Sequence, residues 1–426
     1  MNPEIWKWVW NEFCDSQTHL DALLSRIPES FGPKAKAEVA SRFGPFLRRP
    51  WAISQALGIH LAENPEQFWA QNFIQLRKNE AIHEVLRKLP SSEGSSGAPK
   101  LPSQGGAADF PPHQVQRWAQ DWGEGVAQRL CELLSQDPLT VIRVHRNFEE
   151  KVAEAFPKSR RGRFAPRARV FKGYESVMNQ GLYQEGALEV QDEGSQLMAW
   201  FSVFPELFGR ALGESPQVQK KIFTEVLAEE HSKINSSLTV VDACAGAGGK
   251  TLALADILKG QGRIFAYDIY EKKIQALRRR ATRARETNIQ AVALDADALQ
   301  SLRQKFSGSA DLLLLDLPCG GEGVLRRNPD SKWTRKPLPK PLAADLPPIE
   351  ELQRKIILDY LPLVKKGGRV VYGVCTFKKS ETVEQVEWLN SSSFRDESGI
   401  SLDLRESGFT GPYETDGFFM ASFQVK

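Results

Sequence analysis

Apolar positions follow two different periods along the chain. From Ile5 to about Leu89 they recur at spacings of three and four residues, which predicts amphipathic helices. From Leu238 onward, short apolar runs alternate with amphipathic segments, a pattern typical of a parallel sheet whose strands are joined by helices. The expected strands span residues 238–241, 264–267, 289–294, 312–315, 370–374 and 418–423. The expected helices between the first four strands span residues 251–259, 271–285 and 299–305.

The segment between these two regions has a different pattern. Residues 91–112 are rich in Ser, Gly, Ala and Pro, which bury little apolar surface, so we expect a flexible linker. A helix at 114–134, a strand at 140–144 and a helix at 148–156 predict a small α+β module. The expected parts are a helical amino-terminal extension (1–90), the linker (91–112), the α+β module (113–204), a polar helical insertion (205–237) and a Rossmann-like α/β domain (238–426).

Charge is distributed unevenly. The 56 Lys and Arg against 53 Asp and Glu give a net charge of +3, too little by itself to indicate a nucleic-acid binder. Residues 143–172, however, contain ten Lys or Arg and three Glu, which gives this segment a net charge of +7. This excess favours a surface that contacts a polyanion, and the alternative is a solvated basic loop. The tryptophans Trp6, Trp8 and Trp10 are expected in a core rather than on a base-stacking surface.

The five cysteines lie far apart and form no Cys-x-x-Cys pair, which argues against a disulfide framework or a zinc site. This usage favours a reducing cytoplasm, and we expect no metal. The sequence has no uninterrupted apolar run of about 20 residues, so we expect no membrane span. A basic start followed by an apolar run is also missing, so we expect no signal peptide.

A glycine-rich loop follows the first expected strand of the α/β domain, and its residues 242–251 read DACAGAGGKT. A phosphate-binding P-loop needs glycine six positions before Lys250, where the chain has Cys244, and a dinucleotide fingerprint needs glycine at Thr251. What remains is a strand, a small-residue loop and a helix, followed by a second strand that ends in Asp268. A carboxylate there can accept hydrogen bonds from both ribose hydroxyls of an adenosine, which suits S-adenosylmethionine (SAM).

The third strand ends near two carboxylates, Asp295 and Asp297, either of which could meet the adenine edge. The sequence alone leaves open which of the two carboxylates contacts adenine. The residues expected to hold the cofactor are Cys244, Ala245, Gly246, Ala247, Gly248, Gly249, Lys250, Asp268, Asp295, Asp297 and Asp316.

Two further strands deliver cysteines to the same edge of the sheet. Cys319 follows the fourth strand in the sequence DLPCGGEG, and Cys375 follows the fifth in YGVCT. A free cysteine is usually a small buried apolar residue, and we expect that for Cys14 and Cys131. Cys319 and Cys375 lie at the carboxyl ends of adjacent strands, beside the cofactor loop. We therefore expect both thiols to take part in catalysis.

These motifs resemble those of the RNA cytosine-5 methyltransferases of the bacterial ribosomal-RNA and eukaryotic Nop/Sun group. The loop of that family reads D-x-C-A-A-P-G-G-K-T, so Gly246 and Ala247 stand here for Ala and Pro. Where the family commonly has an asparagine shortly after its second cysteine element, this chain has Thr382. The resemblance covers about residues 114–426 and implies a SAM-dependent enzyme with an RNA-binding module.

The resemblance also implies residue roles. Carbon 5 of cytosine is a poor nucleophile, so the family adds a thiolate to carbon 6 to activate it. By resemblance Cys375 is the nucleophile and Cys319 assists release. Asp316 hydrogen-bonds the ring and Lys250 reaches the base. The cytosine must be unpaired or flipped, because carbon 6 is inaccessible in a stacked duplex.

The expected protein is a cytoplasmic, monomeric RNA (cytosine-5) methyltransferase. Ribosomal RNA is the substrate class that we expect first, and tRNA is the alternative. A DNA cytosine-5 methyltransferase would use Cys319 as its nucleophile, and a catalytically weak RNA-binding ribosome-assembly factor would need neither thiol. Basic residues after Cys319 are expected to guide the RNA, namely Arg326, Arg327, Lys332, Arg335 and Lys336. The arginines of the helix at 271–285 are expected on a solvated face.

Overall fold

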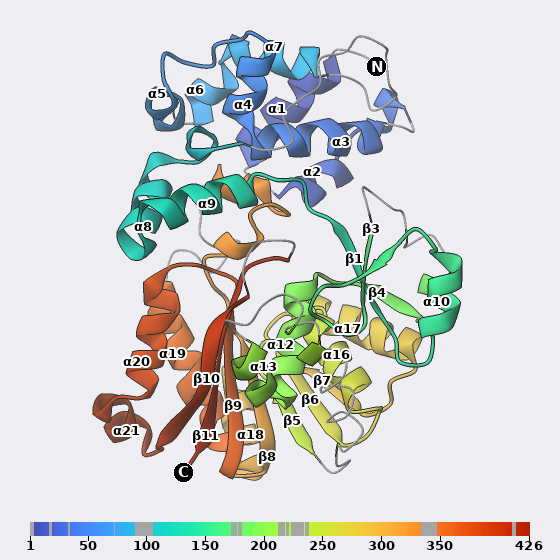
Figure 1. The fold of residues 1–426 in the computed structure, drawn as a ribbon, viewed down its shortest axis with the longest axis vertical. Helices are drawn as coiled ribbons and strands as arrows, with labels where there is room; N and C mark the ends of the chain where they lie inside the picture. Colours follow the sequence, from blue (N-terminus) through green and yellow to red (C-terminus); the bar gives the residue numbers. More distant parts are fainter. Residues whose placement is uncertain are drawn as a thin grey trace. The chain divides into compact units, whose positions relative to one another are not determined.

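The computed structural model describes residues 4–16, 19–32, 35–71, 73–89, 105–171, 177, 181–211, 218, 221–222, 234, 238–333, 347–410 and 415–426. The chain divides into two compact units (Figure 1). The first comprises residues 1–138 and 321–345, and the second comprises residues 139–320 and 346–426. The chain therefore leaves the second unit at Gly320 and re-enters it at Leu346.

The first unit is helical. Its α-helices are α1 (Glu4–Ser16), α2 (Leu20–Ser25), α3 (Ala35–Arg48), α4 (Pro50–Ala56), α5 (Pro65–Ala70), α6 (Phe73–Arg77), α7 (Glu80–Lys88), α8 (Pro112–Trp122) and α9 (Glu124–Leu134). Trp6 and Trp10 are buried in its aromatic core, as expected. Trp333 enters the same core from the second segment of the unit, with its ring 5.8 Å from that of Trp10 and 4.9 Å from that of Trp69.

The single helix predicted at 114–134 is wrong. Gly123 has φ +91° and ends α8, so α9 starts in a new direction. A positive φ strains other residues, which explains why the chain turns at a glycine. Most of the expected linker, residues 91–104, lies outside the described residues. At its end, the Asp109 carboxylate is buried and accepts hydrogen bonds from the Trp51 and Ala52 amides at the start of α4.

A small antiparallel sheet opens the second unit. Its strands are β1 (Thr140–Val144), β2 (Arg160–Arg161), β3 (Ala168–Phe171) and β4 (Leu188–Val190), in the order β2-β3-β1-β4. Helices α10 (Glu149–Ala155) and α11 (Gly181–Gln184) belong to the same region. The expected strand at 140–144 and helix at 148–156 are confirmed.

The main sheet has seven strands in the order β10-β11-β9-β8-β5-β6-β7. They are β5 (Thr239–Asp242), β6 (Arg263–Asp268), β7 (Ile289–Ala293), β8 (Ala310–Asp316), β9 (Val364–Val374), β10 (Leu402–Thr410) and β11 (Phe418–Val425). Strands β5 to β9 pair in parallel, whereas β11 is antiparallel to β9. The expected α/β class and all six expected strands are confirmed. Strand β10 was missed because half of this edge strand is polar.

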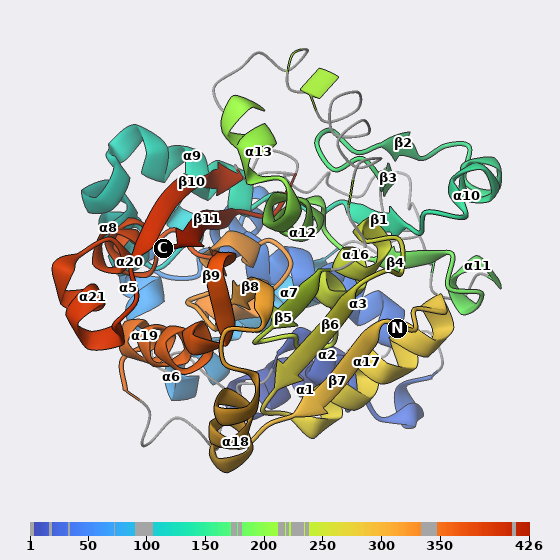
Figure 2. The same cartoon turned by 90° about the horizontal axis from the view of Figure 1, so that it is seen from below.

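Helices cover both faces of this sheet. One face packs against α12 (Glu193–Val203), α13 (Pro205–Ala211) and α16 (Gly249–Ile257), and α17 (Glu271–Ala284) packs beside α16. The other face packs against α18 (Ala296–Phe306), α19 (Ile349–Tyr360), α20 (Val383–Leu389) and α21 (Ser392–Ser398). Figure 2 shows α12 and α13 on one side of the strands and α19 on the other. Most of the expected insertion at 205–237 lies outside the described residues.

Candidate active site

The two cysteines predicted to react are brought together. In the parallel pairing of β8 with β9, Asp316 lies opposite Gly373, so the loops that follow these strands start side by side. The Sγ atoms of Cys319 and Cys375 are 3.3 Å apart, and the Cys375 amide donates to Cys319 Sγ at 3.3 Å. Both are free thiols and partly exposed. The hydrogen bond with Cys319 and burial together raise the pKa of Cys375 well above its usual value.

A lysine cation lies close to this thiol pair. Lys250, near the start of α16, places its Nζ 2.6 Å from an oxygen of Asp316 and 5.0 Å from the Phe418 ring centre. Burial lowers the pKa of Lys250, but the charge and hydrogen bond of Asp316 outweigh burial and raise it. Lys250 therefore stays protonated, and its charge lowers the pKa of Cys375 against the effects that raise it. The predicted Lys250 and Asp316 lie together as one ion pair.

The glycine-rich loop has the backbone geometry of a ligand cradle. Gly248 has φ +88°, and a Cβ there would lie 2.5 Å from Leu277 Cγ, so only glycine fits. Gly246 has φ +56° and open space where a Cβ would be. The two oxygens of Asp268 accept from the Gly246 and Tyr270 amides, each at 2.9 Å. A carboxylate has about four lone-pair sites, so Asp268 can still accept ribose hydroxyls.

Sequence reasoning missed Asp242, the last residue of β5. Its Oδ2 accepts from the Thr251 hydroxyl at 2.6 Å, and its Oδ1 is buried without a hydrogen-bond partner among the described residues. Burial raises the pKa of Asp242 to about 7. A buried acceptor without a partner at the base of the loop is suited to a polar ligand seated above it. The position at the end of the strand, directly before the loop, was the signal that could have identified it.

The remaining cofactor candidates differ in their surroundings. Asp295 caps α18, because its Oδ1 accepts from the Ala298 amide at 2.8 Å, whereas Asp297 lies exposed in the first turn of that helix. Which of them meets adenine stays a prediction. Burial raises the pKa of Cys244. Of the other loop residues, Ala245, Ala247 and Gly248 lie between β5 and α16, and Gly249 is the first residue of α16.

Comparison with known proteins agrees with this geometry. Residues 231–424 match the family model described as 16S rRNA methyltransferase RsmB/F. This part of the chain is similar to the RsmB/F family. A curated relative, the probable ribosomal RNA small subunit methyltransferase B of Bacillus subtilis (strain 168), is 28% identical over 333 residues. The match covers 73% of this chain and 65% of the relative, so the chain spans a little under two thirds of that protein.

Two solved structures share the fold. NSun6 from Pyrococcus horikoshii, solved with SFG, has a TM-score of 0.56 at 18% identity, and the match covers 74% of this chain and 98% of that one. A methyltransferase homologue from the same organism has a TM-score of 0.52 at 19% identity, covering 72% and 93%. The α/β domain of this chain therefore shares the Rossmann-like fold of these two structures.

Several arginines of the basic segment 143–172 form ion pairs inside the protein. Arg143 is buried, and Arg143, Arg146 and Arg167 all donate to the Asp256 carboxylate, at 3.2, 3.2 and 2.7 Å. The positive charge left on the surface of this segment is therefore smaller than the excess of +7 counted from the sequence. His145, Asp256 and Glu286 place ligand atoms within 4.8 Å of one another, as a metal site would. However, the arginines already supply the positive charge that these carboxylates need.

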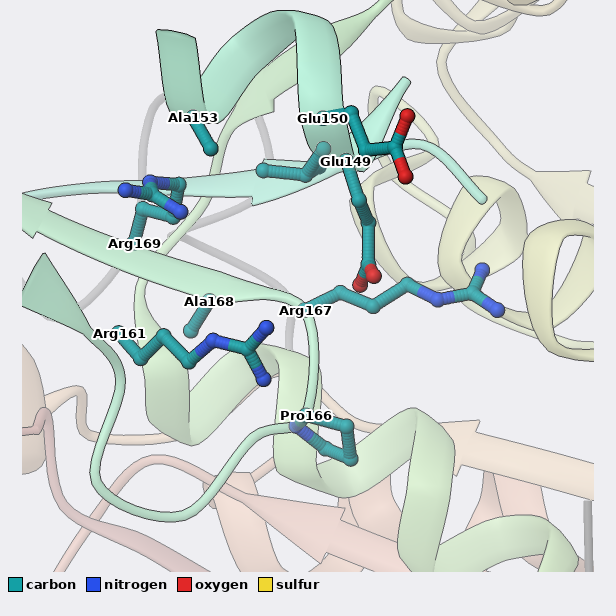
Figure 3. A pocket seen from close by; sticks show the side chains of 9 residues that line it. Glu149, Glu150, Ala153, Arg161, Pro166, Arg167, Ala168 and Arg169 are labelled. Atoms are coloured by element: carbon teal, nitrogen blue, oxygen red, sulfur yellow. The ribbon is translucent and has the colours of Figure 1, made fainter. Parts of the chain in front are cut away.

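Other arginines of this region line a cavity. It has a volume of about 230 Å³ and lies between α10 and the small sheet (Figure 3). Its walls carry Arg161, Arg167 and Arg169 together with Glu149 and Glu150. Arg161 is exposed, so this face remains available to a polyanion.

Two expectations about basic residues are wrong. Arg326 is buried, and Lys332 donates to the main-chain carbonyls of Arg48 and Asp109 at 2.5 and 2.7 Å. These two side chains therefore build the first unit instead of guiding RNA, and Arg335 and Lys336 lie outside the described residues. On α17, Arg280 and Arg283 bind the buried Glu189 carboxylate instead of forming only a solvated face.

No helix of the described residues is long and apolar enough to span a membrane.

Proposed function

We propose that this protein transfers a methyl group from SAM to carbon 5 of a cytosine in RNA, with small-subunit ribosomal RNA as the substrate class and tRNA as the second candidate. The observation that carries the proposal is the 3.3 Å approach of Cys319 and Cys375 at the carboxyl ends of β8 and β9. The RsmB/F match and the name of the Bacillus relative support the choice of RNA. A scaffold protein would need neither thiol.

The thiols supply the chemistry that cytosine lacks. The Cys375 thiolate adds to carbon 6, forming an S–C bond and moving the π electrons of the 5,6 double bond onto carbon 5. SAM, when bound, supplies an electrophilic methyl group, which carbon 5 takes. The Cys319 thiolate, 3.3 Å from Cys375, then removes the proton from carbon 5. Those electrons restore the double bond and expel Cys375 as a thiolate.

The two residues of the ion pair beside the thiols, Lys250 and Asp316, have separate roles in this reaction. The Lys250 cation favours the Cys375 thiolate, because its charge lowers the pKa of that thiol. Asp316 holds Lys250 and presents a carboxylate that can accept a hydrogen bond from the ring nitrogen once that nitrogen carries a proton. Asp242, Asp268 and the loop at Gly246 to Gly249 would hold SAM.

The test compares Cys375→Ala, Cys319→Ala and the double variant, each incubated with SAM and a small-subunit ribosomal RNA transcript and run on a denaturing gel. Cys375→Ala should abolish methyl transfer while SAM binding is kept. Cys319→Ala should accumulate a covalent protein–RNA band that the double variant lacks. A Cys375→Ala protein that still forms 5-methylcytosine would overturn the assignment. A transcript of tRNA in parallel separates the two substrate classes.

A further inference from the structure

The loop that carries Cys319 is held from both sides by buried side chains. On the amino-terminal side, Nε2 of Gln353 in α19 donates to the Pro318 carbonyl at 3.0 Å. On the carboxyl-terminal side, Oε2 of Glu381 accepts from the Gly320 amide at 2.8 Å. Gln353 also donates to the same Glu381 oxygen at 3.0 Å, so the two side chains bind each other as well as the loop.

Neither Gln353 nor Glu381 has any exposed surface. The Tyr372 hydroxyl, in β9, donates to the Glu381 carbonyl at 2.6 Å and lies 3.2 Å from Gln353 Oε1. Gln385 of α20 donates to Gln353 Oε1 at 3.4 Å. The network therefore ties the loop to α19, β9 and α20, and in a dry interior such bonds are strong and costly to break.

The loop also fits closely against this network. A Cβ at Gly320 would lie 2.9 Å from Glu381 Oε1, so the backbone approaches the carboxylate as closely as a glycine allows. Cys375 is placed differently, because it directly follows β9, whose residues pair on both sides with β8 and β11. The position of the Cys319 thiol depends on the bonds to Pro318 and Gly320, whereas that of the Cys375 thiol depends mainly on the sheet.

We propose that Gln353 and Glu381 are positioning residues, here called the Cys319 clamp, that hold the Cys319 thiol where it removes the proton from carbon 5. This inference rests on the proposed function. The attack by Cys375 uses Cys375, Lys250, Asp316 and the cofactor loop, and the clamp side chains donate to or accept from none of these. Loosening the clamp therefore slows release of the methylated RNA more than it slows methyl transfer.

The experiment compares two substitutions of one residue. Glu381→Leu removes the acceptor for the Gly320 amide, whereas Glu381→Gln keeps an oxygen that can accept it. Ser380→Ala is the matched control, because the Ser380 hydroxyl lies in the same turn but donates to Glu350 at 2.6 Å and not to the loop. Each protein is assayed with SAM and the small-subunit ribosomal RNA transcript, in single-turnover and steady-state conditions.

For Glu381→Leu we expect a steady-state rate at least about tenfold below the wild type, with single-turnover methyl transfer within about threefold, and a covalent RNA band that builds up although Cys319 is present. Glu381→Gln and Ser380→Ala should stay within about threefold on both rates and show no band. Unchanged SAM affinity and thermal unfolding show that the variant is folded. If Glu381→Leu does not fold, Gln353→Met breaks the clamp at the Pro318 carbonyl.

The outcomes separate the clamp from the chemistry on which it rests. A band with Cys319→Ala but none with folded Glu381→Leu or Gln353→Met overturns the clamp and leaves the proposed function standing. Equal losses of both rates without a band also overturn it, since they indicate a general structural role. Absence of a band with Cys319→Ala itself overturns the release role of Cys319, and the clamp inference fails with it.

Discussion

Lys250 and Asp316 form a 2.6 Å ion pair between the first turn of α16 and the last residue of β8. The cofactor loop leads into α16, and the Cys319 loop follows β8. The pair therefore joins the expected methyl-donor side of the site to the expected thiol side. The two charges act in opposite directions on Cys375, because the Asp316 carboxylate raises the pKa of this thiol and the Lys250 cation lowers it.

Replacing Lys250 by Met should raise the pKa of Cys375 further, because the cation that lowers it is lost. We expect the rising limb of the single-turnover rate against pH to move up by about one unit, and the rate near neutral pH to fall about tenfold. Lys305→Met, at an exposed position in the last turn of α18, is the control and should leave the profile unchanged. A rate loss without movement of the limb would limit Lys250 to a structural role.

We expect Lys332 to make the stability of the first unit depend on pH. Burial lowers its pKa to about 7, below the ordinary value of 10.5 that applies in the unfolded chain. Between these two values the unfolded chain binds the proton and the folded unit does not, so the free energy of unfolding should rise with pH. The slope is at most about 1.4 kcal/mol per pH unit. Below the folded pKa this gain is absent.

Urea unfolding of the full chain at several values between pH 7 and 10 measures this slope. Lys332→Met removes the titrating group, so its slope should be smaller than that of the wild type. Lys88→Met, at an exposed position that pairs with Glu84, is the control and should keep the wild-type slope. Identical slopes for all three proteins would contradict the prediction.

Arg161→Glu should weaken RNA binding. Arg161 lies exposed at the cavity of the small sheet, and its strand partner is Arg169. We expect a loss of about tenfold in affinity and a decrease of about 0.7 in the slope of log affinity against log salt, the value for one phosphate contact on a single strand. Filter binding of the same transcript at several salt concentrations gives both quantities.

The control for this experiment is Arg129→Glu, which makes the same charge change at an exposed position on α9. Equal losses for Arg129→Glu and Arg161→Glu would indicate a general effect of net charge and would contradict a specific contact at the cavity.

The sequence was sufficient for the features that depend on local pattern. The alternation of apolar runs predicted all six expected strands. Because ligands bind at the carboxyl ends of parallel strands, the sequence also predicted that Cys319, Cys375, Lys250 and Asp316 lie at one edge of the sheet. The surroundings of these residues depend on contacts between distant segments, which no local pattern reveals. Glu381 looked like an ordinary charged residue, yet it is fully buried against Gly320. Charge counting could not show that Arg143 is neutralised by Asp256, 113 residues away.

The excursion of the chain from Gly321 to Asp345 into the helical unit has a practical consequence for dissecting this protein. A fragment that starts at Leu139 would still carry Trp333 but would lack the helices whose aromatic side chains bury it. Exposed aromatic surface of this kind promotes aggregation. A single cut therefore cannot yield two soluble halves. A catalytic fragment needs residues 321–345 replaced by a short polar bridge, and a helical fragment ending at Pro138 needs those residues returned as a peptide.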